Sequence, residues 1–170
     1  TPLQYAIFRA SVPAEVIRIL LDHGAKVNST DPNGKMAIHY AIRRSGDKVN
    51  ALEIAEMLID HGAELDPEKD ENSTALRAAM HNRADMLELV LKNGADPNKH
   101  SKEIKYPIHY AVYNGDVKSV KLLKEYDADL DVKDKAGKTA LDYARDKVNM
   151  KAFGEERKKK YQEIVDVLSE

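Results

Sequence analysis

The apolar residues of this chain recur at helical spacing within short segments, and polar turns separate those segments. Residues 13–22 show the pattern most simply, because their apolar side chains fall three and four positions apart and share one helix face. Residues 51–60 repeat it, and a glycine follows both segments closely, as at many helix ends, where it takes the left-handed conformation. The pattern predicts short amphipathic helices; the apolar stripe of the first is Val16, Ile17, Leu20 and Leu21.

The predicted helices come in pairs, because the sequence repeats itself with a period of about 33 residues. A helix opener recurs as TPLQYAI, MAIHYAI, TALRAAM, YPIHYAV and TALDYAR, beginning at Thr1, Met36, Thr74, Tyr106 and Thr139. A loop signature lies between the openers, as HGAKVN, HGAELD, NGADPN and YDADLD. Each opener therefore predicts an inner helix, and each stretch before a loop signature predicts an outer helix.

These openers and loops resemble the ankyrin repeat, most closely at 106–131, YPIHYAVYNGDVKSVKLLKEYDADLD. The resemblance implies an all-α fold, an ankyrin-repeat solenoid of stacked antiparallel helix pairs with β-turn fingers. It covers nearly the whole chain as a single domain, 1–170. The repeats fall at approximately 1–35, 36–73, 74–105, 106–138 and 139–170. The last is expected to act as a C-terminal cap, since its long polar helix carries one apolar stripe.

The fingers keep a constant length, and the helix hairpins do not. The step from Gly24 to Met36 is 12 residues, and the same step recurs from Gly62, Gly94 and Asp127 to the next opener. Two fingers depart in composition: Asn72 stands where the first finger has Gly34, while Ser101 and Ile104 replace the turn Asp and Gly of the third. Asn50, with Glu53 three residues on, is expected to cap the second outer helix.

The amino-acid composition excludes several kinds of site. The chain has no cysteine, which excludes disulfides and thiolate metal sites. Its apolar runs are too short to cross a membrane. A formal net charge of −2 combines an acidic part, 1–98, a basic part, 99–160, and an acidic last part, 161–170. This asymmetry favours a solvated surface, although a nucleic-acid-contacting array in the basic part stays a weaker alternative.

No catalytic motif is complete. The segment 136–139, AGKT, echoes a phosphate-binding loop but has Val132 where the first glycine is needed. His39 and His109 stand fourth in their openers, where the resemblance implies a hydrogen bond to neighbouring loop backbone. Gln4, Arg77 and Asp142 replace them elsewhere. No histidine pair has metal-ligand spacing within a helix, so we expect no enzyme activity, catalytic residue, metal, cofactor or small-molecule substrate.

The resemblance implies a concave surface, formed by finger tips and exposed inner-helix positions, that grips a protein partner. The inner-helix candidates are Phe8, Arg9, Arg43, Arg44, His81, Asn82, Tyr113 and Asn114. The finger candidates are Asn33, Lys35, Asp70, Glu71, Lys102, Lys105, Lys135 and Lys138. Phe8 and Tyr113 are of the type that anchors interfaces, but either could instead pack between repeats.

The sequence therefore favours a non-enzymatic protein–protein interaction module, or scaffold, that is monomeric and lies in the cytoplasm or nucleus, or in host cytoplasm if secreted. The alternative is a targeting segment of a larger enzyme, or of a pathogen or symbiont effector, whose chemistry lies outside these residues.

Overall fold

The computed structural model describes residues 1–9, 12–44, 48–66, 73–100 and 105–170. Within them every regular element is a helix, and no strand occurs, so the predicted all-α class is confirmed. The helices are α1 (Pro2–Phe8), α2 (Ala14–Asp22), α3 (Ala37–Arg43), α4 (Lys48–Asp60), α5 (Thr74–Met80), α6 (Ala84–Lys92), α7 (Pro107–Asn114), α8 (Val117–Glu125), α9 (Ala140–Val148) and α10 (Glu155–Ser169).

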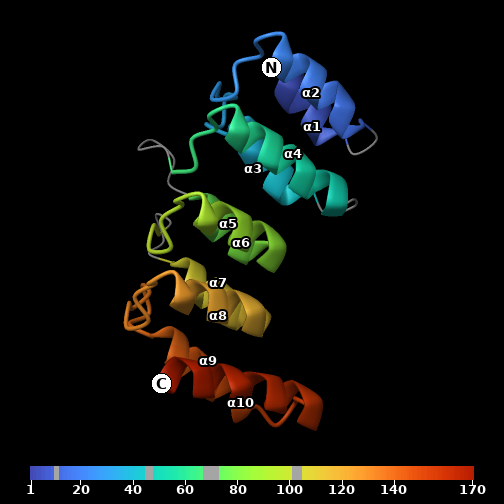
Figure 1. The fold of residues 1–170 in the computed structure, drawn as a ribbon. Helices are drawn as coiled ribbons and strands as arrows, with labels where there is room; N and C mark the ends of the chain where they lie inside the picture. The colour runs from blue at the N-terminus through green and yellow to red at the C-terminus, as the bar shows by residue number, and fades with distance from the viewer. Residues whose placement is uncertain (10–11, 45–47, 67–72, 101–104) are drawn as a thin grey trace.

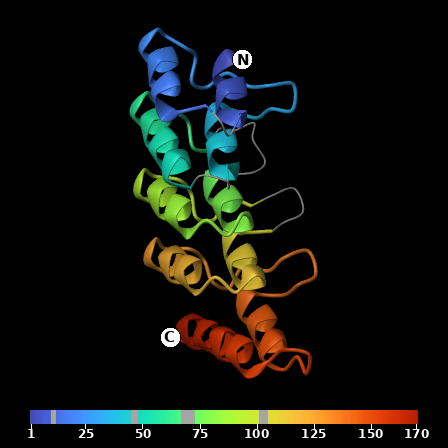
Figure 2. The same cartoon turned by 90° about the vertical axis from the view of Figure 1, so that its right-hand side faces the viewer.

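The helices form antiparallel pairs that stack in chain order from α1/α2 to α9/α10 (Figure 1). Figure 2 shows two layers, with α1, α3, α5, α7 and α9 as the inner layer and their partners as the outer layer. The connections between pairs project from the inner-helix side. The odd-numbered helices are called inner helices below, and the projecting connections are called fingers.

The helix ends follow the local chemistry of the sequence. The Thr1 hydroxyl accepts the Gln4 N–H and caps α1. Gly24 ends the α2 turn at φ +80°, and Asp127 adopts φ +58° at the matching place after α8, as expected. One expectation is wrong: α4 begins at Lys48, so Asn50 lies inside the helix and does not cap it.

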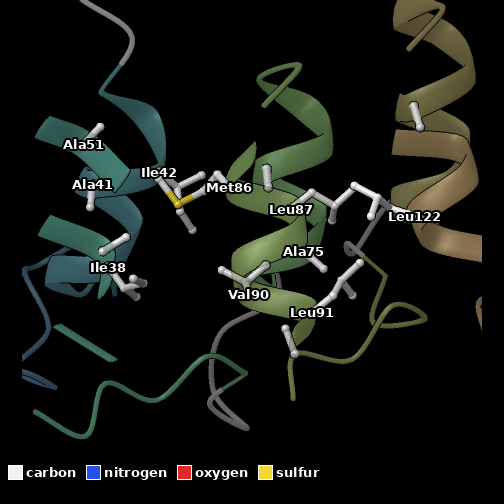
Figure 3. Packing of buried hydrophobic residues seen from close by; sticks show 14 of the residues in the cluster. Ile38, Ala41, Ile42, Ala51, Ala75, Met86, Leu87, Val90, Leu91 and Leu122 are labelled. Carbon is white, nitrogen blue, oxygen red and sulfur yellow. The ribbon is translucent and has the colours of Figure 1, made fainter. Parts of the chain in front are cut away.

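The core is a continuous layer of small and medium side chains between successive pairs (Figure 3). Ile42 of α3 and Met86 of α6 approach each other across one junction, and both are fully buried. Alanines such as Ala41 and Ala75 let the helices approach closely. Burying a side chain of Leu or Ile size contributes about 1.5–3 kcal/mol, so the stack is held together mainly at these junctions.

The last pair closes the core with one face of α10. Tyr161, Ile164 and Leu168 are buried against the preceding helices, and Val165 and Val167 are half-buried beside them. The other side chains of α10 are charged or polar and mostly meet solvent. This arrangement is that of a terminal repeat with a polar outer face.

Candidate functional site

The first and fourth fingers are rigid turns built around an aspartate. The Asp31 carboxylate accepts the N–H groups of Asn33 and Lys35, each at 2.8 Å. Asp134 does the same for Ala136 and Lys138, at 2.9 and 3.1 Å. A glycine at positive φ closes each turn, since few other residues adopt that conformation cheaply. The finger tips are therefore fixed by their own sequence.

A tyrosine of the next inner helix fastens each of these fingers. The Tyr40 hydroxyl donates to Asp31 at 2.5 Å, and the Tyr143 hydroxyl donates to Asp134 at 2.6 Å. The bond to Tyr40 lowers the pKa of Asp31. The hydrogen bond from Tyr143 to Asp134, together with partial burial, raises the pKa of Tyr143 to about 12. Both pairs are therefore a carboxylate and a neutral phenol at neutral pH.

The fourth residue of the opener ties the inner helix to the finger that follows it. Gln4 donates through Nε2 to the carbonyls of Ser29 and Lys35, at 2.7 and 2.9 Å. His109 accepts the Tyr106 N–H at Nδ1 and contacts the Lys138 carbonyl from Nε2 at 3.1 Å. These two contacts require a neutral ring with its proton on Nε2.

Burial acts in the same direction and lowers the pKa of His109, against the opposing effect of the Lys138 carbonyl. The imidazole is thus a neutral structural group that holds a finger, as the resemblance implied. Its two nitrogens are occupied by backbone, which leaves neither free for acid–base chemistry.

Two equivalent hollows lie where fingers meet inner helices. The N-terminal pocket has a volume of about 270 Å³, and its lining residues are Thr1, Gln4, Tyr5, Phe8, Asp31 and Tyr40. The C-terminal pocket has a volume of about 400 Å³, and its lining residues are Lys105, His109, Tyr110, Tyr113, Asp134 and Tyr143. The fourth and fifth positions of the opener, and the eighth position directly after its seven residues, recur in both pockets, so the same register builds both.

Cations lie over the aromatic rings of both pockets. The Arg9 guanidinium lies 5.5 Å from the Tyr5 ring in the N-terminal pocket. In the C-terminal pocket the ammonium groups of Lys105, Lys138 and Lys147 lie 5.8, 5.4 and 5.3 Å from the rings of Tyr110, Tyr143 and Tyr113. Phe8 and Tyr113 are 57% and 68% exposed, so both pockets open to solvent.

The structure shows how exposed each described candidate is. Phe8 and Tyr113 are exposed and do not pack between repeats. Lys35, Lys105 and Asn114 are half-buried. Asp70, Glu71 and Lys102 lie outside the described residues. The other exposed candidates are Arg9, Asn33, Arg43, His81, Asn82, Lys135 and Lys138.

Arg44 is the exception, because it is buried and not available to a partner. Its guanidinium donates to the carbonyls of Ile7 and Val12 in the preceding repeat, at 3.4 and 3.1 Å. The side chain lies just past the end of α3, where it faces the hairpin of the first pair and not the finger side. Asn114 acts similarly, donating to the Ala79 carbonyl at 2.9 Å. The ninth opener position is therefore structural at these two repeats.

The sequence patterns did not identify the fifth opener position as part of the candidate site. Tyr5, Tyr40, Tyr110 and Tyr143 occupy it in four of the five openers and line the pockets. Recurrence of one polar aromatic at a single register position was the available signal. The described residues hold no group of three metal-ligating side chains, and among them no helix is long and apolar enough to cross a membrane.

The geometry defines a class of protein: a solenoid of helix pairs that presents side chains from successive repeats along one side. The chain belongs to the ankyrin-repeat family, since the profile for ankyrin repeats (three copies) matches residues 1–69, 15–101 and 75–153. Ankyrin repeats generally mediate protein–protein interaction, and the family is typically non-enzymatic.

The relatives of this chain are longer ankyrin-repeat proteins and other large proteins. It is 30% identical over 165 residues to ankyrin repeat protein L371 of Acanthamoeba polyphaga mimivirus, a match covering 76% of this chain and 22% of that protein. It is 34% identical over 136 residues to R841 of the same virus, covering 74% and 23%. It is 26% identical over 126 residues to human transient receptor potential cation channel subfamily A member 1, covering 74% and 11%. The chain thus spans under a quarter of the length of each.

Proposed function

We propose that this chain is a non-enzymatic module that binds a partner protein through its finger face, the surface formed by the fingers and the exposed inner-helix side chains. The observation that carries the proposal is the pair of aromatic pockets on that face. An exposed aromatic ring is costly to leave in water and is a frequent centre of binding energy. Here Phe8 and Tyr113 occupy the eighth position in the first and fourth repeats, and both are exposed.

The pockets also favour one kind of partner. The C-terminal pocket offers three tyrosine rings with lysine ammonium groups beside them, and Lys135 is exposed on the adjoining finger. An apolar or aromatic side chain flanked by Asp or Glu would fill the pocket and meet those cations. Such charge complementarity sets orientation and association rate more than affinity.

Binding in this proposal needs no reacting group. His109 is neutral and bonded to backbone at both nitrogens. Desolvation of the ring lowers the pKa of His81, and the positive charges of Arg43 and Arg77 lower it further. The described part of the finger face presents exposed aromatic and charged side chains, which suit recognition of a partner protein.

The test is to identify a partner by crosslinking capture and then to measure its affinity for single alanine variants. Tyr113→Ala, Phe8→Ala and Arg43→Ala should include at least one that weakens binding by about 1 kcal/mol or more. Glu53→Ala and Lys118→Ala, both on exposed sides of outer helices, serve as matched controls and should change little. A partner weakened only by the control variants would overturn the assignment of the finger face.

A further inference from the structure

The hairpin of the last helix pair is the longest in the stack. Six residues, 149–154, separate α9 from α10, whereas α5 and α6 are separated by 81–83, and α7 and α8 by 115–116. Figure 1 shows this last hairpin at the helix ends opposite to the fingers. The earlier pairs stack without the extra residues, so repeat packing does not account for them.

Phe153 of this hairpin is fixed beside the end of α7. Its ring stacks on Tyr161, with 5.8 Å between the ring centres and 21° between the ring planes. The Tyr161 hydroxyl in turn donates to the Tyr113 carbonyl at 3.1 Å. Phe153 is half-buried, and Tyr113 is exposed and lines the C-terminal pocket. The long hairpin therefore places an aromatic ring close to that pocket.

Two cations contact the Phe153 ring. The Lys147 ammonium lies 5.7 Å from the centre of this ring and 5.3 Å from that of Tyr113, so it bridges the hairpin and the C-terminal pocket. The Arg157 guanidinium, in the first turn of α10, lies 4.3 Å from the centre of the Phe153 ring. A cation held over a ring still has N–H donors to offer to other groups. Tyr113, Lys147, Phe153 and Arg157 are called the cap cluster below.

In the described part of the chain, no carboxylate forms an ion pair with either cation of the cap cluster. Cations nearby are paired, because Lys138 lies 2.6 Å from Asp146 and Lys158 lies 3.3 Å from Glu155. These pairs occupy two of the acidic groups of α9 and α10 that are closest to the cap cluster in sequence. The cluster therefore presents positive charge beside aromatic rings at an accessible edge of the last repeat.

The surroundings of the cap cluster favour a short acidic peptide over a nucleic-acid backbone. A planar guanidinium suits bidentate bonds to a carboxylate. A nucleic-acid backbone needs a broad basic face, whereas Asp146, Glu155 and Glu156 are exposed neighbours of the two cations in sequence. These acidic groups would repel a long polyanion, and they leave room for a few carboxylates only.

We propose that the cap cluster binds an acidic segment of the partner protein, continuous with the side chain that fills the C-terminal pocket. Lys147 and Arg157 bond to Asp or Glu carboxylates of that segment. The segment runs from the pocket across Tyr113 toward the last hairpin. This inference rests on the proposed function for the class of partner, and it adds a subsite outside the finger face that gives the bound segment a direction.

The first experiment measures the affinity of the full chain for two labelled synthetic peptides. One peptide is a Phe followed by a run of Glu residues, and the other has Gln in place of each Glu. Fluorescence anisotropy at low ionic strength should show the Glu peptide binding about tenfold more tightly than the Gln peptide. Equal affinities, or no saturable binding of the Glu peptide up to about 1 mM, would overturn the proposal.

Variants of the two cations locate the binding. Lys147→Gln and Arg157→Gln should each weaken binding of the Glu peptide by about threefold and leave binding of the Gln peptide unchanged. The matched control is Lys159→Gln, which removes the same charge from an exposed position of α10 and should change neither affinity. An equal loss in the control would show attraction to the charge of the whole chain, and the cap cluster would then not be a site.

A charge-conserving variant separates binding from support of the hairpin. Lys147→Arg keeps the cation and should retain the preference for the Glu peptide. The urea midpoints of Lys147→Gln and Arg157→Gln should lie close to that of the parent chain. A lowered midpoint with an unchanged preference for the Glu peptide would assign the two cations to the hairpin alone and contradict the proposal.

A partner captured on the finger face distinguishes failure of this inference from failure of the proposed function. A partner that Tyr113→Ala weakens, and that Lys147→Gln and Arg157→Gln leave unaffected, would overturn the subsite and leave the proposed function standing. The peptide measurements need no captured partner, so the two proposals can fail separately. Tighter binding of an oligothymidylate than of the Glu peptide, removed by the same two Gln variants, would overturn the acidic segment in favour of nucleic acid.

Discussion

The N-terminal and C-terminal pockets share one frame and differ in the chemistry placed on it. Each has an Asp-to-Tyr hydrogen bond from finger to next inner helix, and each has an exposed ring at the eighth opener position. The first uses Gln4 to hold the finger where the second uses His109. The repeat register therefore fixes the geometry of the pockets, while the residues at the pocket edge can vary in charge and titration.

The two pockets also differ in how firmly the exposed ring is supported. Tyr161 of α10 donates to the Tyr113 carbonyl at 3.1 Å, and its ring stacks on Phe153. It also lies beside Gly115, where an added Cβ would come within 3.2 Å of the phenol oxygen. Within the described part of the chain no terminal helix supports Phe8 in this way, and its ring meets Tyr40 edge-on.

Removing that support should produce the largest effect. Tyr161→Ala deletes a buried ring and should lower the free energy of unfolding by about 3–5 kcal/mol, in the range seen for buried aromatics. Urea denaturation measures the change. Tyr161→Phe keeps the ring and loses the hydroxyl, so it should cost only about 1 kcal/mol. Equal costs for the two variants would show that the hydrogen bond, and not the ring, supports the pocket.

Exchanging the finger-holding residues should transfer a pH dependence from one pocket to the other. The pKa of His109 is lowered in the folded protein, so as pH falls from about 6.5 the unfolded chain binds this proton first. The free energy of unfolding therefore decreases as the pH falls below about 6.5. Above that pH, His109 does not change it. His109→Gln should remove this part of the loss and change stability at pH 8 by less than about 1 kcal/mol.

The reciprocal variant, Gln4→His, tests the same position in the N-terminal pocket. Gln4→His should add a loss of stability below about pH 6.5, because position 4 is buried and burial disfavours the charged imidazolium. Urea midpoints between pH 5 and 8, compared with those of the parent chain, measure both changes. Parallel pH profiles for parent, His109→Gln and Gln4→His would contradict the assigned role of this position.

Removing the phenol hydroxyls should have the smallest effect, and a similar one in both pockets. Tyr40→Phe and Tyr143→Phe each lose one partly exposed hydrogen bond, worth about 0.5 kcal/mol. The pKa of Tyr143 is raised to about 12, so its contribution is full below about pH 10 and is lost as the pH rises through 12. Spectrophotometric titration should show one late-ionising tyrosine fewer in Tyr143→Phe, and a large cost in only one pocket would break the equivalence.

The sequence predicted the fold because the repeat itself carries the information. The constant finger length and the glycines that end outer helices fix the register. The resemblance to ankyrin repeats supplies the arrangement of the helix pairs. The same register placed Phe8 and Tyr113 at an exposed position. It could not distinguish Arg43, the last residue of α3, from Arg44, which follows it, since adjacent residues at a helix end face different sides according to local backbone angles. The structure alone shows that Arg44 reaches the carbonyls of Ile7 and Val12.

The pocket-lining tyrosines illustrate a second limit. A tyrosine at the fifth position is consistent with a buried junction residue or with a pocket wall, and the difference depends on the finger that meets it. The bonds from Tyr40 to Asp31 and from Tyr143 to Asp134 span nine residues across two elements. Periodicity within one helix does not reveal such a contact.

The side chains of Asn28, Asp66 and Asn98 each accept a backbone N–H of the following repeat, and these bonds have a mechanical consequence. Each bond joins neighbouring repeats only, and the apolar junction beside it is equally local. A stretching force applied to the two ends therefore passes through these junctions in series, so every junction bears the full load. The extension of the stack under tension should then proceed in discrete steps of one repeat, with the weakest junction yielding first.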